Sequence, residues 1–374
     1  MKILQINKLY FPWIGGVEKA VQDIAEGLRE QEGITMTVLA CQPKGKSTAE
    51  LVHGVTVYRA GSWGMALGMP LSLSFFRLFR RLSRSADVLI VHYPFPLGVV
   101  GVRLFARTVP FFVYYHSDIV RQKALARLFA PFDRWVLRNA RGILVSNPAI
   151  IQSSPLLQLF KEKCTVVPFG IDEREFVQDA AREKRITEIQ NRYGKNFVLF
   201  VGRLIYYKGV EYLVEAAERL RNEPENFVLI GEGALQAQLQ QRIAELHLEQ
   251  KITLLPLQDR QTVIDYCFAC GLLVLPSIYR SEAFGIVLME AMAAGKPVIS
   301  TDLGTGTSYI NQHHITGFVV PPRDSVALAG ALHEILRNPH LQKSFGIAAR
   351  ERVHNFFSRT AMVGHLMQII QEKG

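Results

Sequence analysis

Cysteine is scarce in this sequence of 374 residues. Its four positions, Cys41, Cys164, Cys267 and Cys270, are too few and too scattered for a disulfide scaffold, which indicates a reducing compartment. Cys267 and Cys270 form a single Cys-x-x-Cys within an apolar stretch, whereas a zinc site of this kind needs a second pair. We therefore expect small buried side chains at these two positions rather than metal or redox chemistry.

Long apolar runs, metal-binding motifs and targeting segments are also missing. The longest apolar region, residues 88–115, is interrupted by polar residues and prolines, so no membrane-spanning helix is predicted. The start of the sequence has no signal-peptide pattern, which favours a cytoplasmic protein. There is no Asp-x-Asp motif and no histidine set with ligand spacing, so neither a metal ion nor another cofactor is expected.

The charges that are present are unbalanced. The formal net charge is +10, which indicates an anionic partner: nucleic acid, an acidic membrane surface or a phosphorylated substrate. A hydrophobic fraction of 49% and a charged fraction of 20% are typical of a globular protein. The chain length suits two domains of about 150–200 residues each.

Strands and helices are predicted to alternate in two successive series. The first series has strands at residues 2–7, 36–41, 55–59, 88–92, 111–116 and 142–146, and the second at 196–202, 226–231, 252–255, 272–276, 297–300 and 317–320. Such alternation predicts parallel sheets with helices on both faces. We therefore predict an α/β fold of two Rossmann-like domains facing each other across a cleft, with ligands at the carboxyl ends of the strands.

The predicted domain boundaries follow from composition. The first domain is expected to comprise residues 1–175, joined by a last helix within residues 357–374, and the second to comprise residues 176–356. The junction is placed near the polar, charged stretch at residues 172–193.

Two glutamates eight residues apart, Glu282 and Glu290, lie in the segment LPSIYRSEAFGIVLMEAMAAG. A helix is predicted to begin near Phe284 and Gly285 and to include Glu290. The free N–H groups of its first turn suit a diphosphate, while Glu282 can contact a sugar and Glu290 can accept hydrogen bonds from a ribose. The structural alternative is that Glu282 caps the helix and Glu290 lies on its solvated face.

Two cations, Arg203 and Lys208, follow a predicted strand in the segment FVGRLIYYKG. Arginine can bind a diphosphate as a fork, and lysine supplies a point charge. Cations at this position would stabilise the charge that develops on a departing nucleoside diphosphate. The alternative is a pair of surface cations on a loop.

Three further candidates lie at predicted strand ends. Gly15 and Gly16 follow the first strand and either allow a ligand close to the backbone or form a tight turn. His116 follows an apolar strand and either hydrogen-bonds a sugar hydroxyl or is a structural histidine. Asp118 either orients His116 or caps the following helix.

Taken together, these segments resemble glycosyltransferase family 4, the retaining enzymes of GT-B architecture. The resemblance covers nearly the whole chain and is specific in its order: Gly15-Gly16, His116, VPFGID at residues 167–172, FVGRLIYYKG, GEG at residues 231–233, and the glutamate pair. Ser117 separates His116 from Asp118, whereas many members have His-Asp directly, so the resemblance implies less about Asp118 than about His116.

The resemblance implies a role for each site residue. Arg203 and Lys208 would bind the donor diphosphate, Glu290 the ribose, and Gly16 would let the first loop approach the diphosphate. Glu282 and the backbone of Phe284 and Gly285 would hold the donor sugar and phosphate, and His116 would contact the sugar. The implied catalytic set is thus His116, Arg203, Lys208 and Glu282, without an evident protein nucleophile and with retention of anomeric configuration.

The resemblance also implies a substrate class. Residues 114–123 and 301–312 look like those of bacterial transferases that build surface polysaccharides. The implied reaction moves mannose or a related sugar from a GDP-sugar to a glycan or lipid-linked oligosaccharide in O-antigen and lipopolysaccharide biosynthesis. A UDP-sugar donor and a nucleotide-sugar epimerase stay open as alternatives. A nucleic-acid partner is not expected, because the basic residues form no recognised binding module.

Two stretches that mix basic and aromatic residues predict a peripheral contact with the inner face of the cytoplasmic membrane. They are residues 62–84, with Trp63 and four arginines, and residues 120–141, with Trp135. Such composition suits an anionic bilayer interface, which a lipid-linked acceptor would require the enzyme to reach. Amphipathic helices that bury one face in the protein are the equal alternative.

Overall fold

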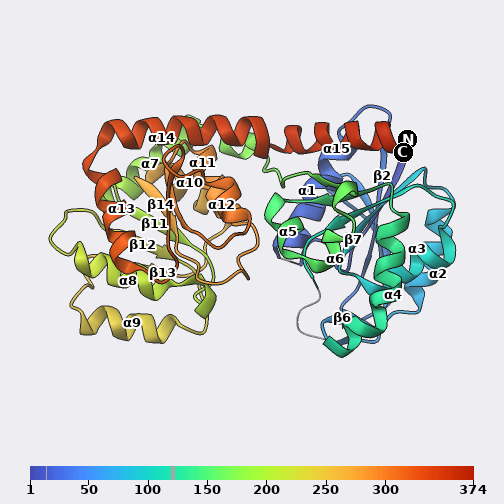
Figure 1. Cartoon of the computed structure of the whole chain (residues 1–374). Helices are drawn as coiled ribbons and strands as arrows, with labels where there is room; N and C mark the ends of the chain where they lie inside the picture. The colour runs from blue at the N-terminus through green and yellow to red at the C-terminus, as the bar shows by residue number, and fades with distance from the viewer. Residues whose placement is uncertain (14, 119–122) are drawn as a thin grey trace. The chain divides into compact units, whose positions relative to one another are not determined.

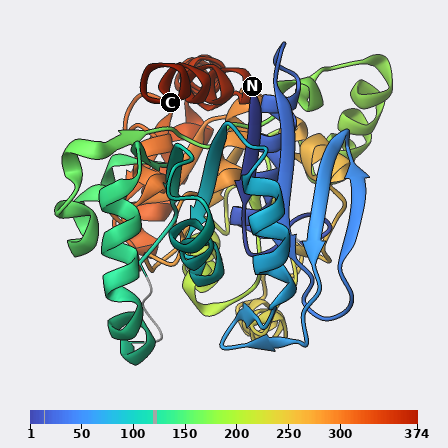
Figure 2. The ribbon, with the colours of Figure 1, turned by 90° about the vertical axis from the view of Figure 1, so that its right-hand side faces the viewer.

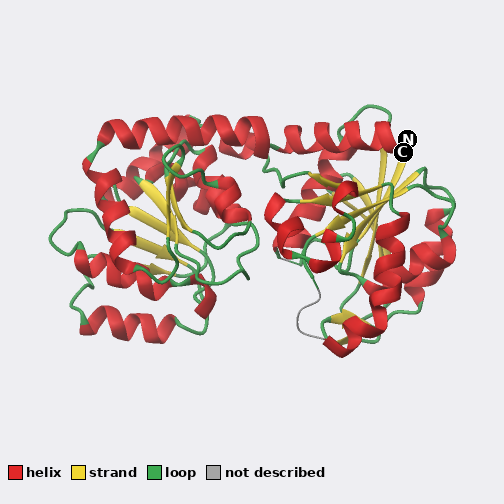
Figure 3. Ribbon diagram, viewed as in Figure 1, coloured by secondary structure: helices red, strands yellow, loops and turns green. Residues whose placement is uncertain are grey.

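The chain forms two compact units in the computed structural model, which describes residues 1–13, 15–118 and 123–374, and their side chains except those of 123–128. Unit 1 comprises Met1–Gly170 and Arg359–Gly374, and unit 2 comprises Ile171–Ser358. In each unit, strands are flanked by helices (Figures 1 and 3). The predicted α/β class with two Rossmann-like domains is confirmed. The polar stretch 172–193, predicted as the junction, lies in unit 2 and ends in α7 (Ala180–Tyr193).

The unit 1 sheet has eight strands in the order β10-β9-β8-β7-β1-β2-β4-β3. Their bounds are β1 (Lys2–Ile6), β2 (Thr35–Cys41), β3 (Thr48–Val52), β4 (Val55–Ala60), β7 (Val88–Tyr93), β8 (Phe111–Tyr115), β9 (Gly142–Val145) and β10 (Cys164–Val166). Neighbours pair in parallel except β3 with β4. Because β1 adjoins β7, the order of strands along the chain reverses there, and a crevice for ligands is expected at their carboxyl ends.

Helices cover both faces of this sheet: α1 (Gly16–Arg29), α2 (Ser74–Ser83), α3 (Pro96–Phe105), α4 (Lys123–Asn139), α5 (Pro148–Ser153) and α6 (Pro155–Gln158). Figure 2 shows α2, α3 and α4 side by side over one face. Side chains alternate along each strand, so Leu4 and Val91 join the core beneath these helices. Their neighbours Gln5 and His92 therefore lie on the opposite face, where Gln5 contacts α1.

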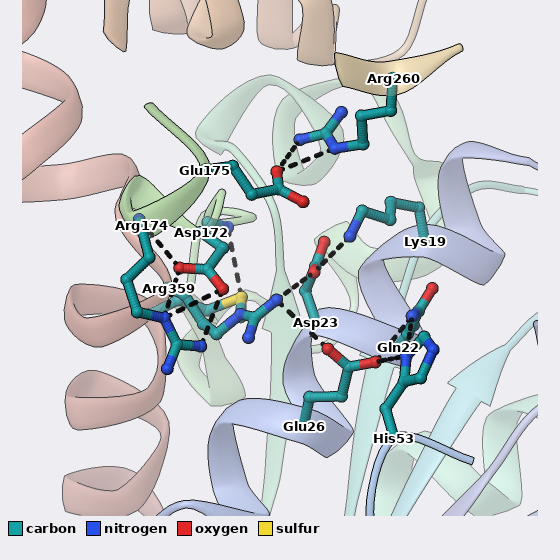
Figure 4. Close-up of polar contacts among 12 residues, drawn as sticks. Lys19, Gln22, Asp23, Glu26, His53, Asp172, Arg174, Glu175, Arg260 and Arg359 are labelled. Carbon is teal, nitrogen blue, oxygen red and sulfur yellow. Dashed lines mark hydrogen bonds and ion pairs between the residues drawn. The ribbon is translucent and has the colours of Figure 1, made fainter. Parts of the chain in front are cut away.

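The last helix, α15 (Arg359–Lys373), packs against α1 within unit 1. Arg359 at its start lies 3.0 Å from Asp23 and 3.3 Å from Glu26, and Lys19 lies 2.7 Å from Asp23 (Figure 4). Burial alone raises the pKa of Asp23, which these two cations oppose. The ion pairs thus compensate charged groups that are almost completely buried.

Unit 2 contains a fully parallel six-stranded sheet in the order β13-β12-β11-β14-β15-β16. Its strands are β11 (Val198–Val201), β12 (Phe227–Ile230), β13 (Ile252–Leu255), β14 (Leu272–Leu275), β15 (Val298–Thr301) and β16 (Gly317–Val320). Besides α7, its helices are α8 (Val210–Arg219), α9 (Gln236–Glu245), α10 (Arg260–Ala269), α11 (Ile286–Ala293), α12 (Gly306–Ile310), α13 (Ser325–Arg337) and α14 (Pro339–Arg352). The strand order reverses between β11 and β14.

The two stretches predicted to contact a membrane are only partly exposed. Phe75 and Phe79 of α2 are completely buried, so these two aromatic rings belong to the core and the prediction was wrong for them. Trp63 is 71% exposed, next to the short hairpin of β5 (Met65–Ala66) and β6 (Met69–Pro70). The second stretch begins outside the described residues, at 120–122. None of the helices in the described ranges combines the length and apolar character needed to cross a membrane.

Candidate active site

The predicted donor-binding residues of unit 2 lie at the reversal of strand order between β11 and β14. Arg203 and Lys208 follow β11, and Glu282, Phe284 and Gly285 follow β14. Both loops leave the carboxyl ends of adjacent parallel strands, which is where open α/β sheets bind ligands. Residues about 75 positions apart in the sequence are thereby brought together.

Gly209 explains how Lys208 is placed. Its φ of +62° is in the left-handed region, and a Cβ here would lie 2.2 Å from the carbonyl oxygen of Pro276. Only glycine lets the two loops approach this closely. The chain can therefore turn from the short 3-10 segment Tyr206–Lys208 into α8 while staying in contact with the loop after β14.

Lys208 and Glu282 form a buried ion pair between these two loops. Lys208 Nζ lies 2.5 Å from Glu282 Oε2, and both side chains are about nine-tenths buried. The Ser277 hydroxyl donates to the same carboxylate oxygen over 3.0 Å. Thr305 Oγ1 donates to the backbone carbonyl of Glu282 over 2.9 Å, which holds the loop from the other side. A cation and an anion are thus held in fixed positions where a charged ligand would enter.

Arg203 extends from the same loop as Lys208 but stays exposed. Its Nη2 donates to the Tyr207 hydroxyl over 3.1 Å. A guanidinium on the rim of a crevice keeps most of its N–H donors for an incoming anion. Arg203 and Lys208 can therefore contact one polyanionic ligand from two directions.

Glu290 lies within α11, where it is 7% exposed. Its Oε1 accepts a hydrogen bond of 2.6 Å from Arg260 Nη1, and Arg260 is held in turn by Glu175, 2.8 Å from its Nε (Figure 4 shows the latter contact). Among the described residues, only Oε1 of the Glu290 carboxylate has a hydrogen-bond partner. Glu290 is thus a fixed, charged acceptor one turn inside a helix whose N-terminus faces the crevice.

In unit 1 the two glycines lie after β1, at the reversal of strand order, where a ligand is expected. Gly15 is the N-cap residue of α1 in an extended conformation, and Gly16 is its first residue. A Cβ on Gly16 would have no atom of the described residues within 4 Å, so packing against them does not require glycine there. Open space at a helix N-terminus suits the approach of an anion.

His116 follows β8 on the same side of the unit 1 sheet. It is 8% exposed and lies in a stack of rings with His92, Tyr114 and Phe169. Its Nε2 is 2.8 Å from His92 Nδ1, and burial lowers its pKa to about 3. His116 is therefore a neutral imidazole, suited to hydrogen bonding rather than to holding a charge.

The structure decides several of the alternatives that the sequence left open. Glu290 is buried and paired, so its placement on a solvated face was wrong. Glu282 pairs with Lys208, while the N-cap of α11 is Gly285. Asp118 accepts from the hydroxyls of Tyr115, at 2.5 Å, and Ser154, at 2.7 Å, and does not orient His116; His92 does.

Sequence reasoning missed Gln5, His92, Arg260 and Glu175. A polar residue inside an apolar strand was a usable signal for Gln5 and His92, since a buried polar group needs a partner. Arg260 and Glu175 carried no such signal, because the packing of α10 brings Arg260 to Glu290, and the turn before α7 brings Glu175 to Arg260. Within the described ranges there is no cluster of three or more His, Cys, Asp or Glu residues placed to hold a metal ion.

Comparison with known proteins identifies the family. Residues 15–170 match the family model of the glycosyl transferase 4-like domain, and residues 181–352 match that of the glycosyl transferases group 1. O-antigen chain mannosyltransferase C of Escherichia coli is 34% identical over 370 residues, covering 97% of this chain and 96% of that protein. This chain is a group 1 glycosyltransferase. The resemblance inferred from the motifs is thereby confirmed.

A second relative of this glycosyltransferase is D-rhamnosyltransferase WbpZ of Pseudomonas aeruginosa, 33% identical over 96% of this chain and 92% of that protein. Solved structures confirm the fold. Sucrose-phosphate synthase of Thermosynechococcus elongatus has a TM-score of 0.78 at 21% identity, covering 99% of this chain and 98% of that one. HepE of Anabaena, solved with UDP, has a TM-score of 0.79 at 19% identity over the full length of both chains. The group 1 glycosyltransferase therefore has the GT-B fold, as predicted.

Proposed function

We propose that this glycosyltransferase moves mannose, or a closely related sugar, from a GDP-sugar to a glycan or lipid-linked glycan acceptor with retention of anomeric configuration. The observation that carries the proposal is the buried Lys208–Glu282 pair at the β11/β14 crevice, beside the helix that contains Glu290. The relatives named as an O-antigen mannosyltransferase and a D-rhamnosyltransferase support the sugar and the pathway.

In this proposal the charges of unit 2 bind the donor. Arg203 and Lys208 contact the diphosphate and stabilise the charge that develops on it as the sugar departs. Glu290, fixed by Arg260, accepts hydrogen bonds from the ribose through the oxygen that Arg260 leaves available. Glu282 and the backbone at Phe284 and Gly285 hold the donor sugar and its phosphate. Because protein cations balance the diphosphate, we expect transfer to proceed in the presence of EDTA.

In unit 1, Gly15 and Gly16 let the loop after β1 approach the diphosphate, and His116 contacts the sugar. No protein nucleophile is included in the reaction. We propose that the acceptor hydroxyl attacks the face from which the nucleotide leaves and that the leaving phosphate takes its proton.

The donor is tested by thermal stabilisation. A ligand that binds only the folded protein raises its unfolding temperature. GDP and GDP-mannose are expected to raise it, whereas ADP and NAD are expected to leave it unchanged. A rise with UDP alone, the nucleotide bound to HepE, would keep the transferase and overturn the GDP preference. No rise with any nucleotide would contradict the donor site.

Retention and acceptor class need product analysis. Proton NMR of the first product gives the configuration at the new glycosidic bond; the α-anomer from GDP-α-mannose is expected, and a β-product would overturn retention. Conversion of the donor without any acceptor would contradict transfer.

We also propose that unit 1 contacts an anionic membrane surface near the β5–β6 hairpin, from a cytoplasmic location. Trp63, Leu67, Leu71 and Leu73 are exposed there, and α2 with its C-cap residue presents Arg77, Arg80, Arg81 and Arg84 to solvent. Exposed apolar side chains beside cations suit the headgroup region of an anionic bilayer. Cosedimentation with phosphatidylglycerol vesicles at low salt is expected, with loss of binding in the Trp63→Ser, Leu67→Ser variant. Absence of binding by the natural sequence would overturn this proposal.

A further inference from the structure

Three buried polar side chains of unit 1 form a chain of hydrogen bonds that ends at His116. Gln5 is in β1, His92 is in β7 and His116 follows β8, so the three come from adjacent parallel strands and the same face of the sheet. Gln5 Nε2 is 2.8 Å from His92 Nε2, and His92 Nδ1 is 2.8 Å from His116 Nε2. Gln5 and His92 are at most 1% exposed, so water does not compete for these contacts.

The backbone of α1 determines which atoms donate and which accept in this series of hydrogen bonds. Gln5 Nε2 also lies 3.0 Å from the carbonyl oxygen of Val21, which accepts hydrogen bonds only. The opposite orientation of the amide would place two oxygens against each other, so the amide nitrogen faces both Val21 and His92. Gln5 therefore donates to His92 Nε2, and this nitrogen of His92 has no proton.

The proton positions on both imidazoles are then determined in turn. Since Nε2 of His92 accepts, its proton is on Nδ1, which donates to His116 Nε2. His116 accepts on Nε2 and so bears its own proton on Nδ1. Burial lowers the pKa of both imidazoles, and for His92 the neighbouring His116 lowers the pKa further, so each imidazole has one proton near neutral pH.

The last group in this series of hydrogen bonds, the Nδ1–H of His116, is a donor without an acceptor among the described residues. His116 Nδ1 has no hydrogen-bond partner among the described residues and is shielded from solvent. An unused N–H in a buried position is costly unless a ligand accepts from it. A ligand oxygen that accepts from Nδ1 would satisfy this donor.

We propose that Gln5 and His92 are positioning residues that keep His116 in the Nδ1–H tautomer, so that His116 donates a hydrogen bond from Nδ1 to a hydroxyl oxygen of the donor sugar. The contact with the sugar rests on the proposed function. The tautomer does not, because Gln5 and Val21 determine it in the absence of substrate.

The tautomer is measured directly by NMR of the full-length protein labelled with ¹⁵N-histidine. Protonated and unprotonated imidazole nitrogens resonate at well-separated frequencies, and loss of signals in His92→Asn and His116→Asn assigns them. The expected result without ligand is Nδ1–H on both His92 and His116. An Nε2–H tautomer of His116, or a charged imidazole at pH 7, would overturn the proposal.

Substitution of Gln5 tests the donor and acceptor assignment of the hydrogen bonds from Gln5 through His92 to His116. Gln5→Glu replaces the donor by a carboxylate, which would accept from His92 Nε2 and shift the proton of His116 to Nε2. Gln5→Leu keeps the approximate size but leaves both tautomers accessible. Tyr114→Phe is the matched control, since it removes a buried hydrogen bond to Val167 from the same ring stack without touching Gln5 or an imidazole nitrogen.

Glycosyl transfer connects the tautomer to function. Because one misdirected hydrogen bond is worth about a factor of ten, kcat/KM for the donor is expected to fall about tenfold or more in both Gln5 variants and within about twofold in Tyr114→Phe. Unchanged tautomers or unchanged kcat/KM in folded Gln5 variants would overturn the proposal. If the natural protein shows Nδ1–H on His116 but turns over no nucleotide sugar, the proposed function and the sugar contact fail while the assigned tautomer stands.

Discussion

The buried carboxylates of Glu282 and Glu290 in unit 2 have cationic partners within the protein, and this determines how substitutions act there. Lys208 and Glu282 lie 2.5 Å apart with little exposure, and Arg260 joins Glu290 to Glu175. Removal of one partner from such a pair leaves an uncompensated charge in a poorly solvated position. Stability and catalysis must therefore be measured separately at these residues.

Lys208→Met is expected to lower the free energy of unfolding of unit 2 by about 3 kcal/mol, since Glu282 is left buried without its cation. The double variant Lys208→Met, Glu282→Gln should recover most of this loss, because the charge is removed together with its partner. Sugar transfer should be lost in both. Circular dichroism during thermal unfolding and a transfer assay check this, and recovery of activity in the double variant would contradict a role of Lys208 in donor binding.

His116 is expected to make unit 1 sensitive to acid. Its folded pKa of about 3 lies below the ordinary value, so between these values the unfolded chain takes up a proton that the folded chain does not. The free energy of unfolding therefore has its full value above about pH 6.5, where His116 is neutral in both states. Below this pH it falls by about 1.4 kcal/mol per pH unit for one histidine.

Tryptophan fluorescence measures this acid sensitivity selectively, because Trp13, Trp63 and Trp135 all belong to unit 1. Urea unfolding should show that the free energy of unfolding of the natural protein falls between pH 7 and pH 5. In His116→Gln this fall should be smaller by about 2 kcal/mol. Equal pH dependence of the two proteins would show that His116 is not held neutral.

Among the elements, α1 and α8 each start at or directly after a glycine, and the two positions lack a side chain for different physical reasons. Gly209 precedes α8 with a positive φ and lies against the carbonyl of Pro276. Gly16 begins α1, and no atom of the described part of the chain lies within 4 Å of where its Cβ would be. The first is required by the fold, whereas the second leaves room for a ligand.

The pair Gly16→Ala and Gly209→Ala separates these reasons. Gly209→Ala should lower the free energy of unfolding by at least about 2 kcal/mol, because alanine is strained at this φ and its Cβ clashes. Gly16→Ala should stabilise slightly, by up to about 1 kcal/mol, since alanine favours the helix. It should nevertheless weaken donor binding, measured by calorimetry; unchanged affinity would remove Gly16 from the binding site.

At the scale of the whole molecule, the last helix in the sequence completes the first unit. α15 buries Met362, Val363, Leu366 and Ile370, and its Arg359 pairs with α1. Each buried apolar side chain contributes about 1.5–3 kcal/mol. Unit 1 therefore depends on a segment that follows the whole of unit 2.

Deletion of residues 359–374 is expected to unfold or strongly destabilise unit 1, with tryptophan fluorescence shifted towards that of the unfolded chain. Unit 2 should keep its own cooperative thermal transition, because α15 belongs to unit 1. Deletion of residues 372–374, which are not buried, is the control. It should change neither the tryptophan fluorescence of unit 1 nor the thermal transition of unit 2. A native tryptophan spectrum after the larger deletion would contradict this dependence.

Much of this architecture was predictable from local pattern. The strand β13 lies where the sequence placed it, and α11 starts directly after Gly285, because apolar runs and glycine punctuation are properties of neighbouring residues. The candidate residues Glu282 and Lys208 were likewise identified from their places beside predicted strands and helices.

The partners of those residues were not predictable in this way. His92 contacts His116, and Gln5 contacts His92, only because β1 lies between β2 and β7 in the sheet. Strand order depends on which surfaces pack best across long stretches of chain, and periodicity contains no information about it. The same applies to Arg260, which meets Glu290 through the packing of α10 against α11.

The fold class, the family and the candidate donor-binding residues could be predicted from the residues and their order, since all of these are expressed in local patterns. Which side chains are buried and which atoms they face depended on the three-dimensional structure: the Lys208–Glu282 pair, the Arg260 contact with Glu290 and the tautomer of His116. The physical reason is that burial and hydrogen-bond direction arise when distant strands become neighbours, and a charge or a proton position is determined only by the groups that surround it.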